Sequence, residues 1–316
     1  MERGPRGSGY DDVISAEDER RHPPGPDELW GESWYFDFAA TDASLGGYVR
    51  LGLYPNKGVA WWWATCVRPG EPTVLVRDHE APLPSASSLE LRSEGLWAEA
   101  TCETPHEHWS IGMEAFGVAL DDPADAYRGE RGTRVAFGID LEWEAAGPLY
   151  EYPQPMTRYE QPCVVHGEVL IGDERLEIDA VGERDHSWGV RDWWAIPWCW
   201  TAGRLEDGTA FHASKPLVEG VSFEPGFVVS PSGDLEPIDG FSVDTEADDE
   251  GIARKATMRV GPLALAVTPV AHAPLALEAS DGRVSRFPRS LCRFAAGDGR
   301  TGVGWTEWNQ PPGWPR

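Results

Sequence analysis

The stretch TRVAFGIDLEWE at residues 133–144 decides the fold class of this chain. Every second residue in it is apolar: Val135, Phe137, Ile139, Leu141 and Trp143. Arg134, Asp140 and Glu142 occupy positions between them. A period of two is typical of a β-strand that has one face in a core and the other in solvent. The stretch therefore predicts a half-buried strand.

The same alternation recurs along the chain. Residues 95–103 repeat it, and two hairpins are indicated, at 164–181 around Gly172-Asp173-Glu174 and at 198–214 around Glu206-Asp207-Gly208. Asp-Gly supplies the positive φ that a tight hairpin turn needs. Further strands are expected at residues 47–54, 59–67, 109–118, 225–230, 252–260, 263–270, 283–295 and 301–308. No long amphipathic helix is indicated, and the best helical candidate is the short segment 123–127.

Many strands without intervening helices predict an all-β fold made of antiparallel sandwiches or barrels. The strands are too many for one small barrel, so we expect two fused lipocalin-like or β-sandwich domains, at residues 29–190 and 191–316. Residues 1–28 are charged and rich in Gly and Pro, and we expect them to form a disordered arm. The Pro- and Tyr-rich segment 147–162 is either a linker or an irregular strand between sheets.

Composition excludes several classes of partner. The chain of 316 residues has 53 Asp and Glu against 27 Lys and Arg, a net charge of -26. This argues against binding to nucleic acid or to anionic lipid, both of which need a basic surface. No apolar segment is long enough for an integral membrane span. The five cysteines are scattered without a CxxC pair, so we expect reduced thiols and a cytoplasmic location.

The densest polar cluster is GERDHSWGVRDWW at residues 182–194. Polar groups among so many aromatic rings are expected to be partly desolvated and therefore paired. In a functional interpretation, Asp185 and His186 supply acid–base catalysis. In a structural interpretation, the cluster is an ion-pair network that fixes a strand crossover, and Arg184, Arg191 and Asp192 belong to it. The two interpretations are compatible.

Aromatic residues concentrate around this cluster, and the chain has 16 Trp in all. We predict that a substrate cavity is lined by Trp62, Tyr159, Trp188, Trp193, Trp194, Trp198 and Trp200. Trp rings stack on flat ligands and stabilise cations through their π faces. The alternative is that the rings fill wide barrel interiors. Glu307, on an alternating strand near the C-terminus, is a further catalytic candidate, paired with Arg191 or Arg184 if it faces an interior.

No metal and no other cofactor is expected. His106 and His108 would share a strand face, with His79, His166 or His212 as a third ligand, but nothing in the sequence brings these together. Ser187 beside His186 does not make a nucleophile–base pair by adjacency alone. Motifs of common hydrolases, nucleotide-binding proteins and calcium-binding proteins are absent.

Three segments resemble the AttH/CrtC-like superfamily, in a bacterial branch of unknown function. Residues 32–36 (ESWYF) resemble its Glu-Trp-Trp-Tyr opening, with Ser33 in place of the first Trp. Residues 182–189 resemble its segment with an Asp-His pair between two glycines, and residues 302–308 resemble its closing strand. Leu120 to Pro123 and Tyr159 to Gln161 also fit the bacterial branch. The resemblance covers about residues 28–312.

The superfamily includes carotenoid 1,2-hydratase, fungal Diels–Alderases and lipid carriers. The resemblance implies two fused β domains that hold a ligand within or between them, and an Asp-His pair, here Asp185 and His186, that delivers a proton to an alkene. We therefore expect an enzyme that hydrates, dehydrates or cyclises an isoprenoid, steroid-like or polyketide-like substrate. The alternative is a carrier that binds such a molecule without chemistry. The sequence does not indicate an oligomeric state.

Overall fold

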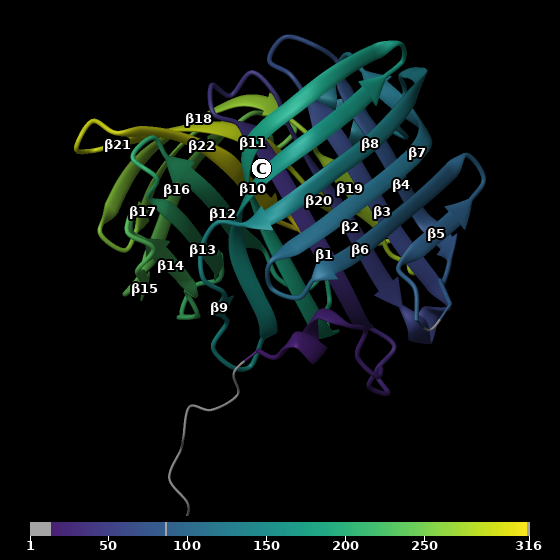
Figure 1. Ribbon diagram of the computed structural model, residues 1–316, viewed down its shortest axis with the longest axis horizontal. Coiled ribbons are helices and arrows are strands. Elements are labelled where there is room, and N and C mark those ends of the chain that lie inside the picture. Colours follow the sequence, from purple (N-terminus) through teal and green to yellow (C-terminus); the bar gives the residue numbers. More distant parts are fainter. Residues whose placement is uncertain (1–13, 86, 315–316) are drawn as a thin grey trace, which may run out of the picture.

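The computed structural model describes residues 14–85 and 87–314, and these form two large antiparallel β-sheets that pack against each other (Figure 1). The all-β prediction is confirmed: the described residues contain no α-helix and only three short 3-10 helices. These are η1 (Ala16–Glu19), η2 (Pro55–Lys57) and η3 (Pro123–Tyr127).

The first sheet has eleven strands in the spatial order β4-β3-β2-β1-β11-β10-β8-β7-β6-β5, with β9 paired to β10. Pairing of β4 with β7 curls the sheet back on itself. Its strands are β1 (Trp30–Ala40), β2 (Gly46–Tyr54), β3 (Val59–Val67), β4 (Thr73–Pro82), β5 (Glu90–Ser93), β6 (Leu96–Thr104), β7 (His108–Leu120), β8 (Thr133–Ala145), β9 (Tyr150–Glu151), β10 (Thr157–Ile171) and β11 (Glu174–Val190).

The second sheet has nine strands in the order β15-β14-β13-β12-β22-β21-β18-β17-β16. These are β12 (Trp198–Leu205), β13 (Ala210–Pro216), β14 (Gly226–Val229), β15 (Leu235–Pro237), β16 (Phe241–Ala247), β17 (Ala253–Val260), β18 (Leu263–His272), β21 (Arg289–Ala296) and β22 (Thr301–Asn309). A separate hairpin pairs β19 (Leu275–Glu278) with β20 (Val284–Phe287). The first sheet therefore ends at residue 190 and the second begins at residue 198.

Alternation along the strands divides the buried side chains into separate cores. On β1, Trp34, Phe36 and Phe38 point into the core enclosed by the first sheet. Tyr35 and Ala39 point the other way, into a core shared by both sheets, which we call the inter-sheet core. A third core is enclosed by the second sheet. Strand β1 is buried on both faces, which explains why no polar–apolar alternation marks it in the sequence.

Two strand predictions were wrong in extent. Residues 182–190 are not a polar segment between strands but the second half of β11, which has 17 residues. Both of its faces carry buried polar side chains there, which hides the period of two. The single strand expected at 283–295 is interrupted at Pro288, which lacks the N–H needed for a continuous ladder, and β20 and β21 belong to different sheets.

The prediction of a disordered arm is wrong for residues 14–28, whereas residues 1–13 lie outside the described part. The segment with η1 packs against the ends of β10 and β11, at the bottom of Figure 1. The Glu19 side chain is only 1% exposed and pairs with Arg184 of β11 at 2.7 Å. A specific buried ion pair therefore holds a segment whose composition alone favours disorder.

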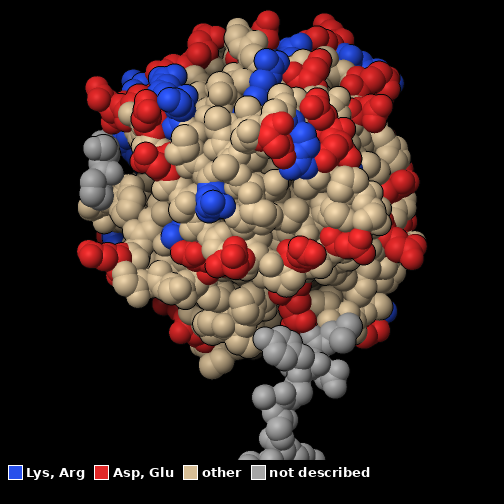
Figure 2. Space-filling model, turned by 90° about the vertical axis from the view of Figure 1, so that its left-hand side faces the viewer, with Lys and Arg blue, Asp and Glu red and all other residues tan. Residues whose placement is uncertain are grey.

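On the face shown in Figure 2, acidic side chains are spread out rather than gathered in one patch. On the face in Figure 2, Asp and Glu surround a broad area that is neither acidic nor basic, with fewer Lys and Arg among them. No helix among the described residues has the length and apolar character required to cross a bilayer.

Candidate functional site between the two sheets

Four carboxyl side chains lie on one face of three neighbouring strands. Register pairs Tyr35 of β1 with Asp185 of β11, and Asp185 with Glu160 of β10. Residues paired in this way share a face, so Asp185 and Glu160 lie in the inter-sheet region with Tyr35. Asp37 and Glu183 lie on the same face, because Asp37 is two residues after Tyr35 on β1 and Glu183 is two residues before Asp185 on β11. All four are at most 6% exposed, and we call Asp37, Glu160, Glu183 and Asp185 the carboxyl row.

Arg158 neutralises one end of the carboxyl row. Its Nη2 lies 2.8 Å from Asp185 Oδ2, and its Nε donates to Glu160 Oε1 at 2.7 Å. The Arg158 side chain is 14% exposed, whereas that of Glu160 is fully buried. This end of the row therefore borders solvent only through Arg158 and Asp185.

Glu160 has two further partners, one from the second sheet and one from the segment that follows β9. Trp200 of β12 donates its indole N–H to Glu160 Oε1 at 3.0 Å, and the Tyr152 hydroxyl lies 3.2 Å from the same oxygen. Tyr152 also lies 2.6 Å from Nε2 of His212, on β13. Burial, reinforced by the charge of Arg158, lowers the pKa of His212 well below its usual value, so this imidazole is neutral. Glu160 Oε2 is buried without a hydrogen-bond partner among the described residues.

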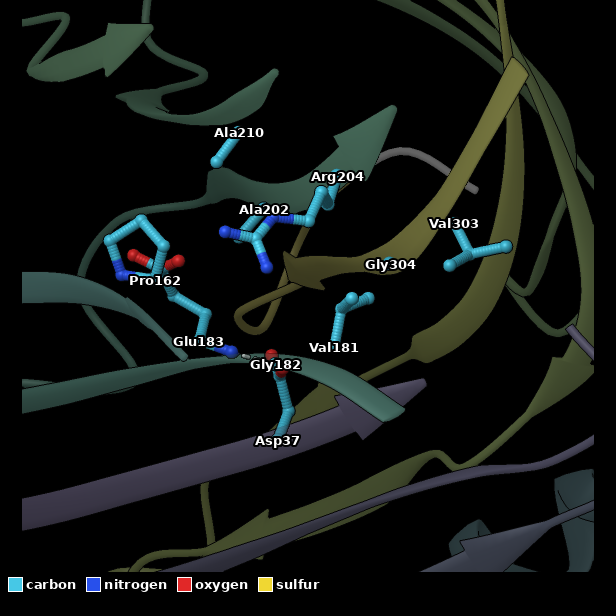
Figure 3. A pocket seen from close by; sticks show the side chains of 11 residues that line it. Asp37, Pro162, Val181, Gly182, Glu183, Ala202, Arg204, Ala210, Val303 and Gly304 are labelled. Atoms are coloured by element: carbon cyan, nitrogen blue, oxygen red, sulfur yellow. Dashed lines mark hydrogen bonds between the residues drawn. The ribbon is translucent and has the colours of Figure 1, made fainter. Parts of the chain in front are cut away.

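The other end of the row adjoins a small enclosed cavity (Figure 3). Asp37 and Glu183 approach it from the first sheet, and Arg204 extends from β12 toward Glu183. Its volume of about 10 Å³ is roughly that of one water molecule. The Glu183 amide donates to Asp37 Oδ1 at 2.8 Å, whereas Glu183 Oε1 is buried without a hydrogen-bond partner among the described residues. The full lining is Asp37, Pro162, Val181, Gly182, Glu183, Ala202, Gly203, Arg204, Ala210, Val303 and Gly304.

A larger open groove of about 720 Å³ lies where the two sheets meet at the surface. It shares Val181, Arg204 and Val303 with the enclosed cavity, so these residues border both spaces. Its lining also includes Phe294, Leu205 and Thr268. A groove of this volume has the size of a typical small-molecule site.

Burial raises the pKa values of three carboxyl groups in the carboxyl row. Desolvation raises the pKa of Asp185 to about 6 and that of Asp37 to about 7. It raises the pKa of Glu183 well above its usual value, and the neighbouring carboxylates Glu160 and Asp37 add to this. The Arg158 guanidinium opposes desolvation at Asp185, so the pKa of this carboxyl rises less than that of Asp37. Asp185 is therefore mostly ionised at pH 7, whereas burial and the neighbouring carboxylates favour the protonated form of Glu183.

Glu307 also lies on this side of the molecule. Its carboxylate pairs with Arg289 of β21 at 3.1 Å and accepts the indole N–H of Trp198 at 3.0 Å. The expected partners, Arg191 and Arg184, are therefore replaced by a residue that the sequence did not indicate. The Arg289 guanidinium lies over the Tyr35 and Tyr48 rings, 4.4 and 4.1 Å from their centroids, and donates to the Tyr35 hydroxyl.

Asp185 and His186 point to opposite faces of β11. His186 Nε2 lies 3.0 Å from Glu32, and its ring stacks on Trp34 at a centroid distance of 4.4 Å inside the first sheet. Consecutive strand residues always diverge in this way. The two predicted acid–base groups therefore cannot act on the same atom of one substrate.

The predicted aromatic lining is divided in the same way. Trp193, Trp194 and Trp200 belong to the inter-sheet core, and Trp198 packs against it. Trp62 lies inside the first sheet, and Tyr159 and Trp188 contact the His186 ring there. Arg50, which the sequence did not single out, lies 4.5 Å from the centroid of Trp63 and 5.0 Å from that of Trp193.

The predicted ion-pair network has different partners. Arg184 pairs with Glu19, and Asp192 lies 3.7 Å from Arg283 near the surface. Desolvation lowers the pKa of Arg191 to about 10, with a further contribution from Arg158, while the charge of Asp185 acts in the opposite direction. Among the described ion pairs, none of these three residues has a partner within 182–194. Arg184 and Asp185 face opposite sides of β11, and Arg191 and Asp192 follow the end of that strand.

Several site residues were missed by the sequence reasoning. These are Asp37, Arg50, Arg158, Glu160, Glu183 and Arg289, whereas His212 was considered only as a metal ligand. Two signals were present: Glu183 lies inside the polar cluster, and Glu160 lies inside the Tyr159 to Gln161 segment quoted for the family resemblance. Of the histidines considered as metal ligands, His108 and His166 both lie beside Glu142, at 3.3 and 3.1 Å from its Oε2. The others have different partners: His106 lies near the Ser15 carbonyl, His79 against Trp63, and His212 against Tyr152.

Comparisons with known proteins find a family model and several solved structures that are similar to this chain. A family model described as a domain of unknown function, DUF7064, matches residues 15–312. No curated protein sequence matches the chain. Among solved structures, a putative AttH from Nitrosomonas europaea is similar with a TM-score of 0.65 and 14% identity, over 95% of this chain and 98% of that one.

Two further solved structures are similar along most of their length. Kievitone hydratase from Nectria haematococca has a TM-score of 0.61 and 10% identity, over 98% of this chain and 96% of its own. CghA, in a crystal with Sch210972, has a TM-score of 0.54 and 12% identity, over 90% and 88%. The AttH-like fold expected from the sequence motifs is therefore confirmed.

Proposed function

This chain belongs to the family described as domain of unknown function DUF7064, and we propose that it performs acid–base chemistry on an alkene of a hydrophobic small molecule. The substrate occupies the groove where the two sheets meet, and the reaction is hydration, its reverse, or cyclisation. Similarity of the fold to kievitone hydratase and CghA supports this class of chemistry.

One observation carries the proposal: two carboxyls on the same buried strand face have opposite electrostatic surroundings. Burial and neighbouring carboxylates raise the pKa of Glu183 well above its usual value and favour its protonated form, whereas the Arg158 guanidinium favours the ionised form of Asp185. Environments that separate the pKa values of two neighbouring carboxyls assign one as acid and the other as base. Burial among aromatic rings makes either charge more effective than it would be in water.

The spacing suits the addition of water. Two residues along a strand are separated by about 6.6 Å, close to the carboxyl separation of about 6.5–9.5 Å that leaves room for a water in inverting glycosidases. Glu183 donates its proton to one alkene carbon, and water attacks the cationic carbon that results. Asp185 accepts the proton that the water loses, and proton transfer back to Glu183 completes the cycle. In a cyclisation, a second alkene of the substrate takes the place of water.

Other residues position these groups. Arg158 and Trp200 hold the Glu160–Asp185 end of the row. Arg289 and Glu307 fix the Tyr35 ring. His186 takes no part in this step, because it faces the interior of the first sheet.

Access to the row requires side-chain movement. The enclosed cavity next to Glu183 holds about one water, so a substrate in the groove reaches the acid only when Val181, Arg204 or Val303 moves aside. The groove alone also suits a carrier, the second candidate, because it binds without involving the row. The two candidates differ only in whether a proton is transferred.

Isotope labelling separates the two candidates. The purified protein, its Glu183→Gln variant and the control Glu177→Gln are incubated with farnesol and geranylgeraniol in H2¹⁸O and in D2O. Glu177 lies on the same strand with its side chain exposed, and Gln at position 183 replaces a carboxyl whose burial favours the neutral form, so both variants should fold. Mass spectrometry reads ¹⁸O for hydration and deuterium for any protonation.

The proposal expects label in products of the wild type and Glu177→Gln, and a loss of about 10²–10⁴-fold in Glu183→Gln. Native mass spectrometry of freshly purified protein reports any co-purified hydrophobic ligand. A retained ligand without label in any variant supports the carrier. Full turnover by Glu183→Gln would refute the assignment of the acid.

A further inference from the structure

Two imidazoles and a carboxylate converge on the face of β11 opposite the carboxyl row. They are His22 of the N-terminal segment, Glu32 of β1 and His186 of β11. We propose that these three side chains bind a divalent transition-metal ion of the zinc class, a site distinct from the carboxyl row and independent of the proposed reaction.

The three donor atoms already lie close to the positions that a metal requires. His22 Nδ1 is 2.8 Å and His186 Nε2 is 3.0 Å from the same carboxylate oxygen, Glu32 Oε1. All three atoms lie within 4.8 Å of one another. Ligands of tetrahedral zinc are separated by about 3.3 Å, as metal–ligand distances of about 2.0–2.1 Å require. The two distances between an imidazole nitrogen and the Glu32 oxygen would therefore have to widen by only about 0.3–0.5 Å.

The outward nitrogen of each imidazole has a partner of the kind found around metal-bound histidines. His22 Nε2 lies 3.3 Å from Asp18 Oδ1, and His186 Nδ1 lies 3.3 Å from the Tyr159 hydroxyl. Such partners orient the ring and leave the other nitrogen free to coordinate. Both rings therefore direct the correct nitrogen toward Glu32.

The surroundings fix these rings in place. His22 stacks on Trp188 at a centroid distance of 3.7 Å, and His186 stacks on Trp34 at 4.4 Å. The side chains of Glu32 and His186 are at most 1% exposed, whereas His22 is 19% exposed on its outer side. The ion thus has two preformed buried ligands and a third on the segment that covers them.

The donor set selects the class of metal. Two imidazoles with one carboxylate suit zinc or ferrous iron, whereas Mg²⁺ and Ca²⁺ prefer oxygen ligands alone. Three protein ligands leave a coordination position for water. This proposal departs from the sequence-based expectation that no metal is bound, because His22 is ten residues from Glu32 and more than 150 from His186.

A bound ion would clamp the N-terminal segment onto β1 and β11. The backbone N–H of His22 already donates to Glu32, at 3.0 Å from each carboxylate oxygen. Coordination by His22 adds a bond between this segment and the sheet, and binding free energy of this kind stabilises the folded state.

Zinc titration of the full chain tests the site. Protein stripped of metal is titrated with Zn²⁺ against a chromophoric chelator, beside His22→Gln, Asp18→Asn and the control His108→Gln. His108 has two carboxylates nearby, Glu142 and Glu144, in a more exposed cluster. Circular dichroism confirms that each variant folds, and Co²⁺ substitution reports tetrahedral coordination by its visible absorption.

The proposal expects one zinc per chain in the wild type and in His108→Gln. Affinity should fall roughly 10–100-fold in Asp18→Asn, through loss of the partner of His22, and further in His22→Gln. Mg²⁺ should not compete. Any of three results would overturn the proposal: no stoichiometric zinc in the wild type, equal affinity in folded His22→Gln, or loss of zinc in His108→Gln alone. None of these results bears on isotope incorporation at the carboxyl row.

Discussion

Replacing Glu19 by Gln tests how the N-terminal segment is held. The Glu19 carboxylate receives hydrogen bonds from two Arg184 nitrogens at 3.2 and 2.7 Å, from the Tyr159 hydroxyl at 2.6 Å and from the His106 backbone at 2.8 Å. Gln offers one acceptor oxygen and turns an NH2 group toward the donors of the other. Arg184, whose side chain is 3% exposed, loses its charged partner.

The expected cost follows from that burial. Removing one member of a buried ion pair costs about 3–5 kcal/mol, because the remaining charge stays desolvated. For a chain of 316 residues this corresponds to a fall in Tm of about 5–8 °C. The Arg184 charge lowers the pKa of Glu19, against the effect of desolvation. A lowered folded-state pKa stabilises the protein above the unfolded value of 4.5, so the difference between wild type and variant should shrink as the pH falls below it.

The assay is thermal unfolding followed by circular dichroism, with Glu17→Gln as the matched control. Glu17 lies in the same 3-10 turn and pairs with Arg20, but both side chains are more than 70% exposed. An exposed pair of this kind contributes less than about 1 kcal/mol. If Glu19→Gln melts within about 1 °C of Glu17→Gln, the buried ion pair does not hold the segment and the reasoning fails.

Three further variants test the inter-sheet region. The pKa of Asp37 is raised from 3.8 to about 7, so the folded state binds this proton more tightly than the unfolded state does. The free energy of unfolding should therefore fall by up to about 4 kcal/mol as pH rises from 4 to 7. Urea titrations should show this part of the decline abolished in Asp37→Asn and retained in Asp244→Asn, where the aspartate is exposed. Arg289→Met should cost about 3–5 kcal/mol, because the Glu307 carboxylate loses its partner, and Glu307→Gln in the same chain should recover part of that loss in a double-mutant cycle. Gly304→Ala should lower the free energy of unfolding by more than about 3 kcal/mol, since its Cβ would lie 2.1 Å from the Ala202 carbonyl oxygen at a φ of +159°. The control Gly297→Ala, whose Cβ would have no atom nearer than 3.8 Å, should melt like the wild type.

The half-buried strands could be predicted from the sequence, whereas the doubly buried ones could not. Strand β8 matches its predicted range, with Phe137 and Trp143 buried and Asp140 exposed. Strands β1 and the end of β11 lie between two cores, so their polar residues are buried on both faces. Alternation of polarity is a signal of solvent on one side, and it disappears where there is none.

Some residues of the proposed site could be singled out in the sequence, whereas their partners could not. Asp185, Trp200 and Glu307 lie in the inter-sheet region as polar or aromatic residues of marked segments. Their partners Glu160, Arg158 and Arg289 come from strands 25 or more residues away from Asp185, a pairing that one sequence does not encode visibly. If residues 182–190 are recognised as a strand, it follows directly that the side chains of Asp185 and His186 point to opposite faces.

The alternation of polar groups on β11 also determines how this strand can pair at all. A shift of its register by one residue would turn Arg184 and His186 toward Trp200 and drive Glu183 and Asp185 into the apolar interior of the first sheet. Each of these groups would then be buried without its counter-charge, at a cost of several kcal/mol apiece. The charges that distinguish the two faces of β11 thus specify the register of this strand. They destabilise a shifted pairing that hydrophobic contacts alone would tolerate.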